Sequence, residues 1–179
     1  SRVICYHGEG AMDQGTFWES LNFSALKKLP ILFVCENNGL AIYSDQRKRM
    51  KTLDICKKVK SFGVHTIKIK DNSTKNIFQS TQKALKRIKK NGQPVFLEIS
   101  TYREVDHVGI NYDFALGYRK KEKQKMMKSL NELNFLKQNT KNFKQIEKKI
   151  NKEISDALNY SLKSNFPHKK CIGSNVTKE

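Results

Sequence analysis

Strands and helices alternate regularly through the first hundred residues of this chain, and few folds can accommodate that order. Short apolar or alternating segments predict strands at residues 1–6, 31–35, 64–69 and 94–100. Segments with apolar residues three and four positions apart predict helices at residues 15–29, 53–62 and 74–90. Strands separated by helices favour a parallel sheet with right-handed crossovers. We therefore expect an α/β fold in which helices flank a parallel sheet.

The first predicted strand lies at the very start of the chain. Val3-Ile4-Cys5-Tyr6 reads as a buried strand, and residue 1 is Ser rather than Met. Because a domain rarely begins within a strand, we expect that the chain is a fragment or that an upstream part is missing. Its 179 residues are nevertheless enough for one domain with a substantial core.

The region beyond residue 101 differs from the sheet-forming part. Residues 102–117 read as a loop rich in Gly, Asp and His, and basic helices are predicted at 118–136 and 142–163. We expect three parts: an α/β domain over residues 1–118, a helical C-terminal extension over 119–166 and a loose tail over 167–179.

The chain is strongly basic, with 35 Lys and Arg against 17 Asp and Glu and a formal net charge of +18. Such a charge invites a nucleic-acid interpretation. However, the excess is spread along the chain and consists mostly of Lys, whereas forks to bases and phosphates favour Arg. We interpret most of the charge as solvated helix faces. A basic module that binds nucleic acid or an anionic surface is kept as an alternative.

The cysteines and the hydropathy disfavour several other classes of protein. Cys5, Cys35, Cys56 and Cys171 form no C-x-x-C pair and no zinc-finger spacing. Cys5 and Cys35 lie within apolar runs, so we expect small buried thiols in a reducing compartment. No run approaches the roughly 18 consecutive apolar residues of a membrane helix, and no secretory leader is recognisable. We expect no membrane partner.

Three polar clusters follow directly after predicted strands, at residues 7–11, 36–40 and 102–107. In parallel sheets, ligands bind beyond the carboxyl ends of the strands. The clusters are therefore expected to converge on one site, and this convergence is the main reason, from the residues alone, to expect a site at all.

The first two clusters have the composition of a phosphate and metal site. The glycines of Gly8-Glu9-Gly10-Ala11 allow a phosphate to approach the backbone, but the Glu9 carboxylate would repel it. A divalent cation between them removes the conflict, because Mg²⁺ is typically held by one or two carboxylates together with phosphate oxygens. Asn38 could supply a neutral oxygen to the same ion. Taken singly, each cluster is equally compatible with an ordinary turn.

Taken together, the clusters and the segments between them resemble a known family. The chain reads Gly8-Glu9-Gly10-Ala11, then Leu29-Pro30, then Glu36-Asn37-Asn38-Gly39, with Thr101-Tyr102-Arg103 and His107 further on. This pattern is similar to the alpha chain of the first, decarboxylating component of the thiamine diphosphate-dependent 2-oxo acid dehydrogenases, whose diphosphate motif begins with G-D-G and ends with N-N. The resemblance implies the thiamine diphosphate-binding fold.

The resemblance also implies roles for individual residues. It assigns cofactor binding to Gly8, Glu9, Gly10, Ala11, Asn38 and His107, and metal binding to Glu9, Asn38 and the carbonyl of Leu40. His107 would be catalytic, near the reacting carbon or in acyl transfer, and Arg103 would order its loop. Glu9 replaces the family's Asp and is longer by one methylene, so the ion or the loop must shift.

The implied function is the oxidative decarboxylation of a small 2-oxo acid with acyl transfer to a lipoyl-type acceptor, using thiamine diphosphate and Mg²⁺. The implied partners are the beta chain of the same component, in a heterotetramer, and a lipoyl-bearing acyltransferase. Such an enzyme would act in the cytoplasm, or in an organelle matrix of a eukaryote, and only with its partner chain. An inactive or split remnant of the family stays open as an alternative.

Overall fold

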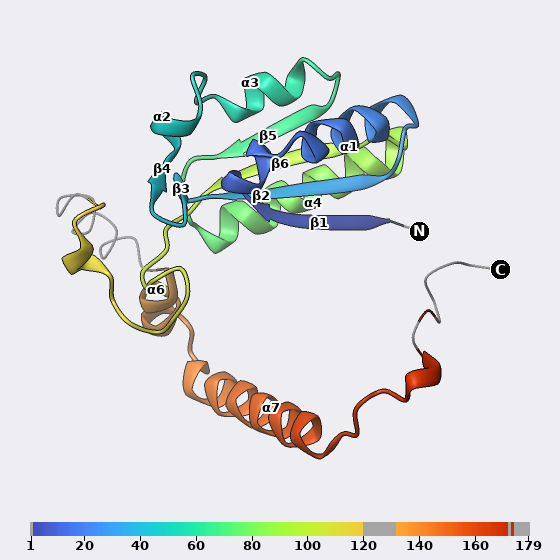
Figure 1. Ribbon diagram of the computed structural model, residues 1–179. Helices are drawn as coiled ribbons and strands as arrows, with labels where there is room; N and C mark the ends of the chain where they lie inside the picture. The colour runs from blue at the N-terminus through green and yellow to red at the C-terminus, as the bar shows by residue number, and fades with distance from the viewer. Residues whose placement is uncertain (1, 120–131, 172, 174–179) are drawn as a thin grey trace. The chain divides into compact units, whose positions relative to one another are not determined.

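The computed structural model describes residues 2–119, 132–171 and 173, which fall into two compact units. The first unit runs to Glu132 and contains the sheet, whereas the second begins at Leu133 and is helical (Figure 1). Within the described ranges, no helix combines the length and the apolar character needed to cross a membrane.

Four parallel strands form the sheet, in the order β1-β2-β6-β5 (Figure 1). The strands are β1 (Val3–Gly8), β2 (Ile31–Asn37), β5 (His65–Ile69) and β6 (Val95–Ser100). Each neighbouring pair is parallel, with Gly8 beside Glu36 and Asn37 beside Ser100. This sheet with its flanking helices confirms the predicted fold class.

Helices cover both faces of the sheet. α1 (Gly15–Leu26) and α3 (Ile55–Lys60) lie on one face, and α4 (Thr74–Asn91) lies on the other (Figure 1). Each crossover between parallel strands contains one of these helices, as parallel pairing requires. The limits of α4 follow from its sequence: Ser73 caps its first turn, and Gly92 ends it with φ +64.

The core is divided between the two faces. The buried apolar residues on the side of α1 and α3 are Met12, Leu21, Phe33, Cys35, Ile55, Cys56, Val59, Val64 and Phe96. Those on the side of α4 are Leu32, Val34, Ile69, Ala84, Ile88, Val95, Leu97 and Ile99. A strand that is buried on both faces needs apolar side chains at successive positions, which explains the unbroken apolar run at the start of β2.

β1 is an edge strand, and it differs from the buried strand that the sequence predicts. Val3, Ile4, Cys5 and Tyr6 are all exposed, Tyr6 by 67%. β1 pairs with β2 on one side, and no strand pairs with its other side among the described residues. An apolar pattern identifies a strand without showing what covers it. The prediction that Cys5 is buried is therefore wrong, whereas Cys35 is buried.

Short elements follow the carboxyl ends of β1 and β2. After β1 comes η1 (Glu9–Asp13), a 3₁₀ helix. After β2, the strands β3 (Leu40–Ala41) and β4 (Ser44–Asp45) form a small antiparallel hairpin, and α2 (Gln46–Arg49) follows directly. Gly39 precedes the hairpin with φ +77, a left-handed conformation that favours glycine. These elements occupy the edge of the sheet where the sequence predicts a site.

The basic C-terminal helices are described in part. The predicted helix at 118–136 begins with a bend at residues 118–119, lies outside the described residues at 120–131, and then becomes α6 (Glu132–Asn139). The predicted helix at 142–163 is confirmed as α7 (Phe143–Lys163). The loop and the tail each contain one turn of 3₁₀ helix, η2 (Phe114–Leu116) and η3 (Lys169–Cys171). The proposed division at residue 118 adjoins the segment 120–131, outside the described residues.

Candidate functional site

The two glycine and asparagine segments meet at one edge of the sheet. Glu9 comes directly after β1 and Asn38 directly after β2, and these neighbouring strands are parallel with Gly8 beside Glu36. Neighbouring strands lie about 4.8 Å apart. Furthermore, η1 packs against β3 so closely that a Cβ on Gly10 would lie 2.8 Å from the Cβ of Ala41. The structure therefore holds both segments in one place.

Glu9 is a buried carboxylate with a cation beside it. Only 1% of its side chain is exposed, and its Oε1 accepts a hydrogen bond from Nη2 of Arg49 at 2.7 Å. The other Nη of Arg49 contacts the carboxylate of Asp13, so one guanidinium joins α2 to both acids of η1. Burial raises the pKa of Glu9, and the positive charge of Arg49 opposes this effect.

Asn37 and Asn38 both close the turn that follows them. The Oδ1 of Asn37 accepts the N–H of Gly39 at 3.0 Å, and the Oδ1 of Asn38 accepts the N–H of Leu40 at 2.9 Å. An amide oxygen has two lone pairs, so this bond leaves Asn38 with one for a cation. On its other side, Asn37 donates through Nδ2 to Oε1 of Glu98 at 2.9 Å.

Glu9, Asn38 and the carbonyl of Leu40, the predicted metal ligands, are of a chemical type that suits Mg²⁺. All three would present oxygen, the ligand type that this ion prefers. In the part of the chain that the structure describes, no three His, Cys, Asp or Glu side chains could hold a metal ion. Such a cluster is not needed for Mg²⁺, which keeps several waters and adds phosphate oxygens to one or two carboxylates. The residues fit the ion if Glu9 exchanges Arg49 for it, or binds it through its second oxygen.

His107 lies on the exposed loop that follows β6. Its Nδ1 is 3.2 Å from Nη1 of Arg103. Because an Arg side chain can only donate, Nδ1 is the acceptor here and the ring proton is on Nε2. Asp106 connects the loop to the β3–β4 hairpin, since its Oδ1 accepts both the backbone N–H of His107 at 2.6 Å and the hydroxyl of Tyr43 at 3.0 Å.

A second buried carboxylate, Asp113, anchors the same loop. It forms ion pairs with Arg119 and, at 3.5 Å, with Arg103, and it accepts the hydroxyl of Tyr118. Burial alone would raise the pKa of Asp113, but the hydrogen bond and charge of Arg119 outweigh burial and lower it. Arg103 also donates to the carbonyl of Ile42 at 3.1 Å. Arg103 therefore ties the His107 loop to the hairpin.

His7, the histidine that directly precedes the glycine segment, has a packing role. Its ring lies 4.9 Å from the ring of Phe17 and 6.0 Å from that of Phe96. Burial lowers its pKa, and its buried Nε2 has no hydrogen-bond partner in the structure. This environment favours a neutral imidazole within the aromatic core.

Three residues that organise the site were not identified from the sequence: Arg49, Glu98 and Asp113. Arg49 belongs to a basic run, Gln46-Arg47-Lys48-Arg49, and nothing in that run distinguishes a buried arginine from a solvated one. Glu98 does carry a signal, because it is the one acidic residue in the apolar run of β6. An acid in a strand expected to be buried predicts a polar partner, although not which one.

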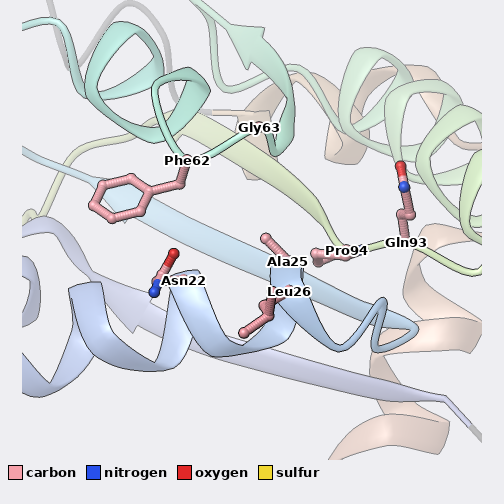
Figure 2. Close-up of a pocket in the computed structure, with 7 residues that line it drawn as sticks. All are labelled: Asn22, Ala25, Leu26, Phe62, Gly63, Gln93 and Pro94. Carbon is pink, nitrogen blue, oxygen red and sulfur yellow. The ribbon is translucent and has the colours of Figure 1, made fainter.

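A hollow of about 290 Å³ lies elsewhere in the first unit (Figure 2). It is lined by Asn22, Ala25, Leu26, Phe62, Gly63, Gln93 and Pro94. Gly63 and Pro94 precede β5 and β6, so the hollow is at the amino ends of the strands, opposite the edge that carries Glu9. None of its lining side chains is titratable, and it contributes no residue to the site.

Comparison with known proteins identifies the group to which this arrangement belongs. A family model described as the dehydrogenase E1 component matches residues 1–170. The chain belongs to this family. The E1 family uses thiamine diphosphate, typically with Mg²⁺, and the predicted resemblance to the alpha chain of the 2-oxo acid dehydrogenases is confirmed.

Individual relatives of the E1 family match parts of the chain. The mitochondrial 2-oxoisovalerate dehydrogenase subunit alpha of Mus musculus is 33% identical over 105 residues, which cover 59% of this chain and 24% of that protein. The pyruvate dehydrogenase E1 component subunit alpha of Rickettsia bellii is 25% identical over 175 residues, which cover 92% and 53%. The chain thus spans between a quarter and about half of these relatives. A transketolase structure from Pichia stipitis aligns with a TM-score of 0.49 and 20% identity, over 56% of this chain and 15% of that one.

Proposed function

We propose that this chain is part of the alpha subunit of a thiamine diphosphate-dependent 2-oxo acid dehydrogenase and holds the metal-diphosphate end of the cofactor. One observation carries the proposal: η1 and the β3–β4 hairpin pack together at the carboxyl edge of the sheet, around the buried carboxylate of Glu9. Membership of the E1 family supports the class of cofactor, and the geometry supports the choice of residues.

In this proposal, two adjacent segments share the binding of one ion and one diphosphate. Glu9, Asn38 and the carbonyl of Leu40 would hold Mg²⁺, which would neutralise charge on the diphosphate. Gly8, Gly10 and Ala11 would contribute backbone N–H groups to the diphosphate, because these positions lack large side chains and the first N–H groups of a helix have no partner within it. When bound, thiamine diphosphate supplies the electron sink for decarboxylation of a 2-oxo acid.

His107 is the residue of this chain that we assign to the reacting end. Its Nε2–H is available as a donor because Arg103 occupies Nδ1. A neutral ring in this tautomer can donate a hydrogen bond to a substrate oxygen near the reacting carbon. The contacts from Asp106 and Arg103 to the β3–β4 hairpin hold the loop beside the segment that carries Asn38 and Leu40.

The relatives support the substrate and partner classes of the proposal. Their names specify pyruvate and 2-oxoisovalerate, both small 2-oxo acids. E1 alpha subunits act with beta subunits, so we assign a beta chain, in a heterotetramer, as the partner of the whole protein. A lipoyl-bearing acyltransferase would accept the acyl group, in the cytoplasm or an organelle matrix.

Isothermal titration calorimetry tests this function directly. The chain is combined with its beta partner and titrated with thiamine diphosphate in the presence and absence of Mg²⁺. We expect binding that requires the metal and that is lost in the double variant Glu9→Gln, Asn38→Ala. Binding that is independent of the metal, or equal in the variant, would refute the assignment of these residues. Absence of any binding would favour an inactive remnant with the same fold.

A further inference from the structure

We propose that Glu98 is a positioning residue for the metal site: it fixes the orientation of Asn37 and, through it, the turn that presents Asn38 and Leu40. The metal part of this inference rests on the proposed function, whereas the turn can be examined without a metal. Glu98 lies in β6, and its link to the turn is the hydrogen bond that it accepts from Asn37.

The first step concerns the unfavourable free energy of burying the Glu98 carboxylate in the sheet. Glu98 is 1% exposed and pairs in register with Cys35 on one side and Lys68 on the other. Two residues before it on the same face of the strand is Phe96, in the apolar core beneath α1 and α3. A charge in such a place is unfavourable unless every oxygen has good partners, and an apolar residue would pack there as well or better.

Glu98 has three partners, from three different elements. Its Oε1 accepts from Nδ2 of Asn37 in β2 at 2.9 Å. Its Oε2 accepts from Sγ of Cys56 in α3 at 3.2 Å and pairs with Nζ of Lys68 in β5 at 3.1 Å. Burial, together with the hydrogen bond and charge of Glu98, raises the pKa of Cys56 to about 12, so this thiol remains a donor. Oε1 of Glu98 therefore contacts the residue that begins the turn, whereas Oε2 contacts side chains of α3 and β5.

The second step concerns the side-chain amide of Asn37, whose oxygen and nitrogen could exchange places by a rotation of the group. An ionised carboxylate only accepts hydrogen bonds, so Glu98 requires the NH₂ of Asn37 to face it. The amide oxygen of Asn37 then faces outward and accepts the N–H of Gly39 at 3.0 Å. The backbone of Asn37 is held as well, because its carbonyl accepts the N–H of Thr101 at 2.9 Å.

The third step connects the turn to the ion. Gly39 has φ +77, and Leu40 donates its N–H to Asn38, so the carbonyl of Leu40 and the amide of Asn38 are set by the same closed turn. If Asn37 rotates, the bond to Gly39 is lost and the turn loses one of its two closing bonds. Removing a group that orients a metal ligand without touching the metal typically weakens metal affinity by about 10–100-fold.

The test separates this role from a purely structural one. Glu98→Met removes the acceptor of Asn37 but fills the core with an apolar side chain of similar length. The ion-pair partner of Glu98, Lys68, is 37% exposed and can turn its charge to solvent, so no buried charge is left unpaired and the unfolding midpoint is expected to change little. Asn37→Ala removes both this link and the bond to Gly39, so it shows the effect of losing the turn bond itself. The matched control is Cys56→Ala, which removes a buried partner of Glu98 and leaves the bond to Asn37 in place.

Two quantities are measured on the full chain and the three variants, each combined with the beta partner. Amide hydrogen exchange at Gly39 and Leu40, followed by NMR, reports the turn, and Mn²⁺ binding in the presence of thiamine diphosphate, followed by electron paramagnetic resonance, reports the site. In Glu98→Met and Asn37→Ala we expect exchange at Gly39 to be about tenfold faster, as for the loss of one hydrogen bond. We expect Mn²⁺ affinity to be about tenfold weaker, and Cys56→Ala to match the wild type in both quantities.

Unchanged exchange at Gly39 and Leu40 in Glu98→Met overturns the inference. Equal acceleration in Cys56→Ala also overturns it, because Glu98 would then act only through the core. If Glu98→Met does not fold, Asn37→Asp decides in the same way, because it keeps an oxygen for the N–H of Gly39 but removes the donor to Glu98. If the variants show the expected exchange pattern but the wild-type complex binds no Mn²⁺, the role of Glu98 in the turn is supported and the proposed function is refuted.

Discussion

At the level of single residues, the pair formed by Glu9 and Arg49 explains how a buried carboxylate is tolerated before any metal arrives. Both side chains are largely buried, and the guanidinium also contacts Asp13. The positive charge of Arg49 opposes the effect of burial on Glu9, and its contacts hold α2 against η1. Mg²⁺ would either displace Arg49 from this carboxylate or bind its second oxygen.

We predict that Arg49→Met destabilises the fold by about 3–5 kcal/mol, because breaking a buried pair leaves a charge without a partner. The matched control is Arg47→Met, two residues earlier, whose pair with Asp45 is 67% exposed on the arginine side. Solvent screens an exposed pair, so the control should lose far less stability than Arg49→Met. Urea unfolding followed by circular dichroism measures both. Equal losses in the two variants would contradict a buried role for Arg49.

Asp113 leads to a prediction about pH. Its pKa in the fold is below the ordinary value of 3.8, chiefly because Arg119 outweighs burial. Such a group contributes stability that is complete above the ordinary pKa and is lost as the pH falls through the lowered one. We therefore predict that the stability difference between the wild type and Asp113→Asn is largest near neutral pH and shrinks between about pH 5 and pH 3. Urea titrations across that range measure it, and a difference independent of pH would exclude an ionised Asp113 as the anchor.

The sequence pattern predicted the candidate metal ligands better than the charged residues that hold the surrounding loops in place. Glu9 and Asn38 stand out because glycine and asparagine turns directly follow predicted strands. Arg49 and Asp113 do not stand out, because a charged residue in a basic run or a loop is usually solvated. Their burial depends on packing between segments that are far apart in the sequence, and no local pattern encodes it.

At the level of elements, the contact between η1 and β3 decides whether the two site segments can approach each other. Gly10 is the critical position, because its missing Cβ makes room for Ala41. We predict that Gly10→Ala costs about 1–3 kcal/mol, the usual range for overpacking, and weakens metal-dependent cofactor binding. Thermal unfolding and calorimetry of the variant measure the two effects.

Gly8→Ala is the matched control for stability. A Cβ on Gly8 would meet nothing within 4 Å, and its φ of −79 is open to any residue. The fold should therefore be unaffected within about 0.5 kcal/mol, as for an ordinary surface substitution. If Gly8→Ala were as destabilising as Gly10→Ala, the close contact with Ala41 would not be the cause.

The order and type of the main elements followed from periodicity, but their environment did not. β2, β6 and α4 lie where the apolar pattern predicted them, with ends shifted by one or two residues. β1 was predicted to be buried and is an exposed edge, because an apolar strand looks the same whether or not a helix covers it. The hairpin and α2 after Gly39 were too short to carry a periodic signal.

At the level of the whole molecule, the net charge of +18 allows the alternative of a basic module to be tested. We predict that duplex DNA binds the chain weakly, without sequence preference, and is released when the salt concentration rises from about 50 to 200 mM. Electrophoretic mobility shifts across a salt series measure this. Tight binding to one sequence that survives 200 mM salt would favour the nucleic-acid alternative.

The arrangement of the whole sheet explains why the sequence was sufficient to infer the family. Parallel strands joined by helices send their carboxyl ends to one edge, so short motifs 30 positions apart in the chain identify one site. For the chain beyond residue 119, the sequence pattern predicts basic helices but not what they pack against. An amphipathic pattern identifies an apolar helix face without identifying the surface that covers it.

Paramagnetic NMR with Mn²⁺ in place of Mg²⁺ is the most direct test of the proposed site. When Mn²⁺ and thiamine diphosphate are added to the isotope-labelled chain in complex with its unlabelled beta partner, the amide signals of Gly10, Ala11, Gly39 and Leu40 should broaden first. The signal of Gly63, at the opposite edge of the sheet, should stay sharp. Broadening centred on any other part of the chain, or none at all, would contradict a metal held between Glu9 and Asn38.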